Sequence, residues 1–143
     1  MSETNNYIVK MKTNEAYKSL IFDNWKYQQG SAEGYMFDVS AQSGDFIGKQ
    51  PFFLYRASFE QFLNKLEKMA TRLYGSTELK EEYENHYVKM ELDTTGHLTV
   101  VGEFRYYSHL EQHLKFGFVT DQTCLIPLHN DLSRVVNELH TKK

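Results

Sequence analysis

Between Tyr87 and Val119, three segments alternate apolar and polar residues, and only short turns separate them. The apolar positions that share a face are Val88, Met90 and Leu92, then Leu98, Val100, Phe104 and Tyr106, then Leu114, Phe116 and Phe118. Asp93-Thr94-Thr95-Gly96 has the composition of a tight hairpin turn. Parallel neighbours would need crossovers of about a dozen residues, so these segments predict an antiparallel meander.

The first half predicts further strands. Tyr7–Met11 is a short apolar segment, Gly34–Ser40 alternates strictly, and Phe46–Arg56 reads as the strand returning after a turn at 43–45. Pro51 within the returning strand indicates an edge position or a bulge, because proline donates no hydrogen bond to the ladder. Residues 13–29 fit either a strand or a short helix, and over so few residues periodicity does not decide.

Two helices complete the predicted fold. For the first, over 58–74, Ser58 and Gln61 form a capping box, an apolar stripe follows, and Gly75 provides the stop. The second covers about 124–140, with Asp121 or Thr123 as the cap, provided that Pro127 lies in its first turn. Otherwise it begins near residue 130. We therefore predict a single α+β domain over 1–143, in which an antiparallel sheet packs against two helices as a two-layer sandwich.

Charge and targeting signals narrow the function. The 16 basic residues are scattered among 19 acidic ones, for a net charge of −3, so we expect no nucleic-acid partner. Residues 1–12 lack the basic and apolar regions of a signal peptide, and no apolar run approaches the length that crosses a bilayer. We expect a cytoplasmic protein without membrane contact.

Candidate catalytic and metal-binding residues are few. Cys124 is the only cysteine, and we expect it to be a small buried apolar residue rather than a nucleophile. His109 and His113 have the spacing of a helical metal site, but this segment reads as a loop entering a strand, where the pair would be too far apart for one ion. We predict no catalysis, no metal and no cofactor.

The most suggestive polar feature is an acidic stretch with neighbouring tyrosines. We propose as partner-binding residues Glu78, Glu81, Glu82, Tyr83, Glu84, Tyr87 and Tyr107. Carboxylates steer a basic partner toward the surface, and exposed tyrosines often anchor interfaces. The alternative is a solvated helix or loop face without a binding role.

Four segments carry a family resemblance, in order along the chain. They are the turn Ser43-Gly44-Asp45-Phe46-Ile47-Gly48, the helix start Ser58–Leu66, the hairpin Thr95–Val100 with Gly102, and Phe118–Leu125 before the last helix. Together they resemble the WapI-like immunity proteins of bacterial polymorphic, contact-dependent toxin systems. The resemblance implies a protein that binds and neutralises a cognate toxin domain, often a nuclease, with no cofactor and no reaction of its own.

Two other functions remain open at this level. An aromatic-rich sheet could roof a pocket for a small molecule between sheet and helices. Edge strands could instead pair between chains in a structural homodimer. For the immunity function implied by the resemblance, we expect a monomer or a weak homodimer.

Overall fold

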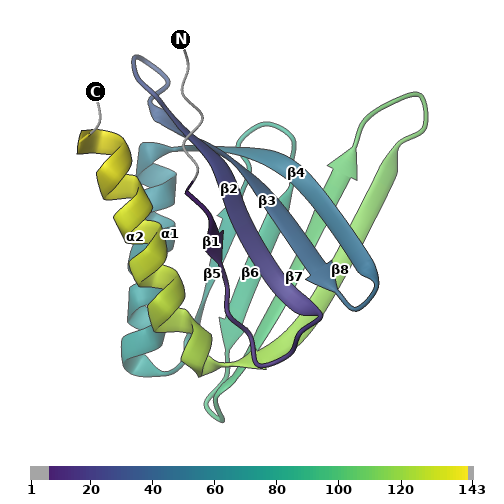
Figure 1. Cartoon of the computed structure of the whole chain (residues 1–143), viewed down its shortest axis with the longest axis vertical. Coiled ribbons are helices and arrows are strands. Elements are labelled where there is room, and N and C mark those ends of the chain that lie inside the picture. The colour runs from purple at the N-terminus through teal and green to yellow at the C-terminus, as the bar shows by residue number, and fades with distance from the viewer. Residues whose placement is uncertain (1–6, 142–143) are drawn as a thin grey trace.

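The computed structural model describes residues 7–141, so the first six residues of the predicted domain and its last two lie outside the described part. Its strands and helices, in chain order, are β1 (Val9–Lys10), β2 (Lys18–Gln28), β3 (Gly34–Ser43), β4 (Phe46–Tyr55), α1 (Arg56–Arg72), β5 (Gly75–Lys80), β6 (Tyr87–Leu92), β7 (His97–Tyr106), β8 (Gln112–Asp121) and α2 (Leu125–Thr141). The strands form two four-stranded antiparallel sheets, β1-β2-β3-β4 and β5-β6-β7-β8 (Figure 1). The predicted α+β class is confirmed, and the structure adds the division of the strands into two sheets.

Strand β2 resolves the ambiguous segment 13–29. The alternation breaks at Asn24, where the register with β3 shifts between Asp23 and Lys26 and the backbone adopts a positive φ of 56°. This bulge inserts one residue, so that Trp25 is buried on the same side as Phe22. A strand interrupted in this way does not show a clean period of two. Strand β1 is shorter than the predicted Tyr7–Met11.

Strand β4 lies at an edge of the first sheet, as Pro51 predicts. Among the described strands it pairs with β3 alone. The backbone N–H of Phe53 points away from β3, because it donates to a side chain outside the sheet. Pro51 lies two residues earlier, so its missing N–H would also have faced the free edge.

Helix α1 begins earlier than predicted, and the capping box at Ser58 is wrong. Tyr55 is the N-cap residue and makes no side-chain cap hydrogen bond. The N–H of Arg56 instead donates to the carbonyl of Glu33 at 3.0 Å, so a tertiary contact satisfies the helix start. The helix ends at Arg72, its C-cap residue Leu73 is in the left-handed conformation, and Gly75 is already the first residue of β5, so the predicted glycine stop is also wrong. The apolar stripe is confirmed.

Helix α2 confirms the second predicted helix. A 3-10 turn, Gln122–Cys124, precedes it, and the side chain of Asp121 accepts the N–H of Thr123 at 2.9 Å. Pro127 is the third helical residue, so the alternative start near residue 130 is wrong. Both helices have 17 residues, and within 7–141 no helix has the length and apolar character needed to cross a membrane.

Strand β5 is the element that the sequence did not predict. The alternative interpretation of this part of the acidic stretch as a helix or loop face is wrong for Glu78, which lies in β5. Only Thr77 and Leu79 face the core, because the strand is short and its other side chains are polar and exposed. Two inward positions are too few for a recognisable alternation.

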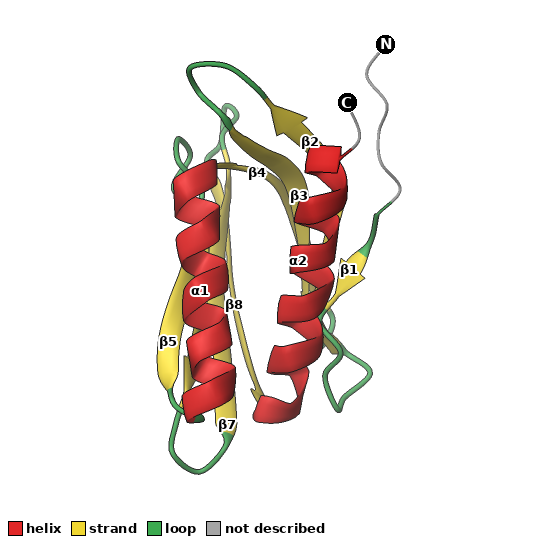
Figure 2. Ribbon diagram, turned by 90° about the vertical axis from the view of Figure 1, so that its left-hand side faces the viewer, coloured by secondary structure: helices red, strands yellow, loops and turns green. Residues whose placement is uncertain are grey.

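The helices lie side by side and cover one side of the two sheets (Figure 2). Phe59 of α1 reaches the first sheet, with its ring 5.9 Å from Trp25 and 5.7 Å from Phe37. Phe52 of β4 meets Phe104 of β7 at 5.9 Å, so the sheets also contact each other directly. This aromatic core fixes β4 against the second sheet and thereby positions the turn between β5 and β6.

Candidate partner-binding surface

The predicted site residues fall into three places in the structure. Glu81, Glu82, Tyr83 and Glu84 occupy the turn between β5 and β6, hereafter the 81–86 turn. Tyr107 lies in the loop between β7 and β8, close to this turn. Glu78 and Tyr87 lie on the outer face of the second sheet instead. The structure thus brings five of the seven residues toward one end of the molecule.

Glu81 is inside the turn rather than on its surface, with 5% of the residue exposed. Its carboxylate accepts the backbone N–H groups of Tyr83 at 2.8 Å, of Phe53 at 3.3 Å and of Glu84. A buried carboxylate with three backbone donors fixes the path of the chain. Glu81 therefore shapes the turn and joins it to β4.

Glu82 extends the same attachment along the free edge of β4. Its N–H donates to the carbonyl of Phe53 at 3.1 Å, and its carboxylate accepts the N–H of Tyr55 at 3.1 Å. These contacts occupy edge groups that would otherwise be open to pairing. The turn thus covers the last part of an exposed sheet edge.

The aromatic rings of the turn and of β4 stack together. The ring of Tyr83 stacks on Phe53 at 5.8 Å, and its hydroxyl lies 2.6 Å from that of Tyr55. The hydrogen bond with Tyr55, together with partial desolvation, raises the pKa of Tyr83. Even so, 62% of Tyr83 is exposed, so the ring is held in place and open to a partner.

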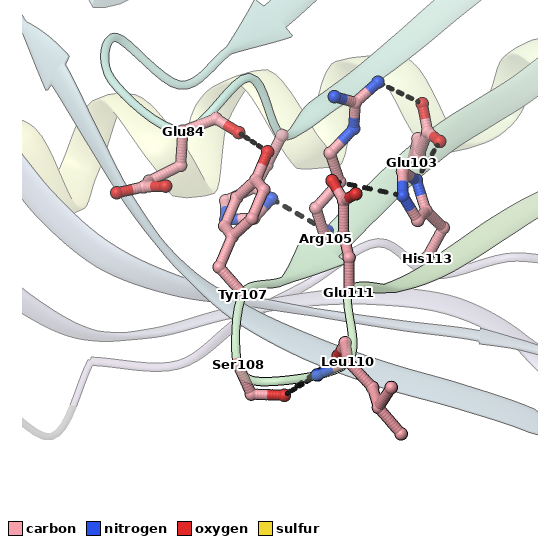
Figure 3. A network of polar contacts seen from close by, with 9 residues as sticks. Glu84, Glu103, Arg105, Tyr107, Ser108, Leu110, Glu111 and His113 are labelled. Atoms are coloured by element: carbon pink, nitrogen blue, oxygen red, sulfur yellow. Dashed lines mark hydrogen bonds and ion pairs between the residues drawn. The ribbon is translucent and has the colours of Figure 1, made fainter.

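The loop between β7 and β8 reaches the turn from the other side (Figure 3). The hydroxyl of Tyr107 donates to the carbonyl oxygen of Glu84 at 3.5 Å, and 48% of Tyr107 is exposed. Below it, the N–H of Arg105 donates to Nδ1 of the buried His86 at 3.0 Å. Burial lowers the pKa of His86, which favours the neutral ring that this bond requires.

A second buried carboxylate, Glu103, lies on the outer face of the second sheet, and the sequence did not single it out. Only 6% of the residue is exposed. Nδ1 of His113 lies 3.0 Å from one carboxylate oxygen and the Arg105 guanidinium 3.3 Å from the other, while Glu111 approaches the far side of His113 at 3.4 Å (Figure 3). The hydrogen bond from His113 and then that from Arg105 lower the pKa of Glu103. The alternation along β7 puts Glu103 on the face opposite Leu98 and Val100, where nothing in the sequence indicates burial.

The two remaining predicted residues are separate from the turn. Glu78 is exposed and pairs in register with Lys89, and Tyr87 is half-buried opposite Lys80 and Glu103. We therefore define the tyrosine–carboxylate surface by the residues that the structure brings together, with Tyr55 added from β4. It comprises Tyr55, Glu82, Tyr83, Glu84 and Tyr107.

The candidate residues Cys124, His109 and His113 lie in three different surroundings. Cys124 is buried as predicted, and desolvation raises the pKa of its thiol to about 11. His109 is exposed in the loop between β7 and β8, whereas His113 lies in β8 against Glu103 and Glu111. Within residues 7–141, no three His, Cys, Asp or Glu side chains are grouped so as to hold a metal ion.

One comparison with known proteins finds a match, and two find none. A family model described as "Immunity protein WapI-like family" matches residues 10–140. No curated protein and no solved structure matches the chain.

Proposed function

This chain belongs to the WapI-like immunity protein family, and from that membership we propose that it binds and neutralises a cognate toxin domain by protein–protein contact. Proteins of this family are typically non-catalytic, and we propose no reaction for this one. The match over residues 10–140 is the single observation that carries the proposal. We further propose that it acts in the cytoplasm, as a monomer or a weak homodimer.

We propose that the tyrosine–carboxylate surface makes the central contact with the toxin domain. Tyr83 and Tyr107 together present two large, stiff side chains with polar tips, the kind of residue that anchors interfaces. Both make a hydrogen bond to a neighbouring element, so little side-chain freedom is lost on binding. Glu78 and Tyr87 remain in the proposal as outlying contacts on the second sheet.

Carboxylates on this surface favour a basic partner. Glu82 and Glu84 stand beside the two tyrosines, and the chain as a whole carries a net charge of −3. Opposite charges accelerate association more than they deepen affinity. A nuclease fits this description, because a site that binds phosphate is lined by cations. We therefore propose a nuclease as the class of toxin.

A rescue experiment tests the proposal. Cells producing the toxin domain encoded beside this gene should survive when the full chain is produced with it. The double variant Tyr83→Ala/Tyr107→Ala should lose this protection while keeping its far-UV circular dichroism spectrum. Tyr74→Ala is the matched control, because Tyr74 is 54% exposed and lies at the distant end of α1.

Two outcomes contradict different parts of the proposal. Cell death despite abundant wild-type protein would reject the immunity function itself. Full protection by the double variant would leave that function intact and reject the tyrosine–carboxylate surface.

A further inference from the structure

A groove of about 560 Å³ lies on the outer face of the first sheet, beside the 81–86 turn. Met36 and Phe53, which are register partners on β3 and β4, line it and are half-buried. The bulge at Asn24 borders the groove on the side of β2, and Glu84 borders it on the side of the turn. The groove therefore adjoins the tyrosine–carboxylate surface and shares Glu84 with it.

The side of the groove formed by β2 is a fixed structure. Asn24 adopts a positive φ of 56°, which is uncommon for a residue other than glycine. Its side-chain amide donates to Asp38 on β3 at 2.7 Å, which ties the bulge to the neighbouring strand. A groove bordered in this way exists before any ligand arrives.

The charges that line the groove are predominantly negative. Among the described residues that line it, Lys26 is the one cation, against the carboxylates of Asp38, Glu81 and Glu84, which gives the lining a net charge of −2. Asp38 already accepts from Asn24, and Glu81 is occupied by backbone donors. Within residues 7–141, the Glu84 carboxylate accepts no hydrogen bond and forms no ion pair, although its backbone is bonded. Glu84 is therefore the acceptor available to a ligand.

Phe53 supplies an aromatic ring to the same groove that Glu84 lines. Tyr83 stacks on Phe53, so the ring is fixed, and Phe53 also lines the groove. A guanidinium group is flat, weakly hydrated and always charged, so it can stack on a ring while donating two hydrogen bonds to a carboxylate. An ammonium group cannot satisfy both requirements equally well.

We infer that this groove receives an arginine side chain of the toxin domain, with the guanidinium between the Phe53 ring and the Glu84 carboxylate. The identity of the partner rests on the proposed function, whereas the guanidinium site rests on the groove alone. The two claims can therefore be tested separately.

The direct test is a titration of the full chain with N-acetyl-L-arginine amide, followed by nuclear magnetic resonance of the methionine methyl groups and backbone amides. The neutral isostere N-acetyl-L-citrulline amide serves as the control ligand. We expect saturable shifts of the Met36 methyl and Phe53 amide signals with the arginine probe and not with citrulline. Absent shifts, or equal shifts with both probes, would overturn the inference.

Variants locate the probe within the groove. Glu84→Gln should weaken binding of the arginine probe by about fivefold, because a charged acceptor becomes neutral. Met36→Lys places a cation in the groove and should abolish the shifts at Phe53. Gln42→Lys is its matched control, since Gln42 is a half-buried residue on the same face of β3 outside the groove. Unchanged binding in both groove variants would also reject the site.

The outcome for the groove is separable from that for immunity. A chain that binds the arginine probe but does not protect cells keeps the guanidinium site and loses the proposed function. A chain that protects cells but shows no shift with the probe loses only the groove.

Discussion

Two carboxylates of this protein are buried to nearly the same degree, but their partners differ. Glu81 in the 81–86 turn is held by backbone N–H groups of the turn and of β4. Glu103 on the outer face of the second sheet is held by the side chains of Arg105 and His113. The first set of donors cannot turn toward water without moving the chain, whereas the second can.

The difference separates a residue that shapes the fold from one that balances charge. If Glu81 is removed, the N–H groups lose their acceptor within a turn that packs against another strand. If Glu103 is removed, Arg105 and His113 can be hydrated, because their side chains are about one third exposed. We therefore expect the turn to depend on Glu81 far more than the second sheet depends on Glu103.

The largest effect is expected for Glu81→Ala. Three backbone donors lose their acceptor, one of them on β4, and buried donors without a partner cost free energy. We expect the free energy of unfolding in urea to fall by about 3 kcal/mol. Hydrogen exchange of the Tyr83 and Glu84 amides should accelerate in the same variant.

Glu81→Gln is the matched variant for this prediction, because its amide oxygen can still accept the N–H groups of Tyr83 and Glu84. The amide nitrogen replaces the oxygen that accepts the N–H of Phe53, so the variant loses the charge and the bond to β4. We expect its loss of stability to be smaller than that of Glu81→Ala. An equal loss would show that the two bonds within the turn contribute little to its stability.

An intermediate effect is expected for Glu103→Gln, with a characteristic pH dependence. The folded-state pKa of Glu103 is lowered by His113 and Arg105. Its contribution to the free energy of unfolding is therefore present above the pKa that this carboxyl has in the unfolded chain. The contribution is lost as the pH falls through the pKa of the folded state. Near neutral pH we expect the free energy of unfolding of the wild type to exceed that of the variant by about 1 kcal/mol. This difference should close below about pH 4.

Urea titrations between neutral and acidic pH measure this gap. Glu91→Gln is the control, because Glu91 is exposed on the same face of the second sheet. A gap that stays constant with pH, as expected for the control, would contradict the role given to His113 and Arg105.

The difference between local patterns and long-range contacts explains how far the sequence predicts the fold. Strands β6, β7 and β8 and both apolar helix stripes follow from intact periodicity, which is a local property. The bulge at Asn24 interrupts the period in β2, and β5 offers only two inward positions. The start of α1 depends on the Glu33 carbonyl, a contact that no local pattern contains.

The sequence indicates which stretch of chain carries the candidate site, but not how its side chains are arranged. The acidic composition pointed to the 81–86 turn, and the structure places Tyr83 within this turn and Tyr107 against it. That Glu81 is buried depends on Phe53, which is 28 residues away along the chain. That Glu103 is buried depends on His113 across a hairpin. Sequence composition does not distinguish a carboxylate that binds the backbone from one that faces a partner.

The smallest effect is expected for Tyr83→Phe, which tests whether backbone bonds to Glu81 alone order the turn. The change removes only the hydroxyl that meets Tyr55 at 2.6 Å and keeps the ring stacked on Phe53. We expect the urea midpoint and the slow exchange of the Glu84 amide to be unchanged, because neither depends on that hydroxyl. An alkaline absorbance titration should lose one late-titrating phenol, since the pKa of Tyr83 is raised by its bond with Tyr55. If Tyr83→Phe instead loosened the turn as much as Glu81→Ala does, side-chain contacts at the surface would be setting its shape, and the contrast between Glu81 and Glu103 would fail.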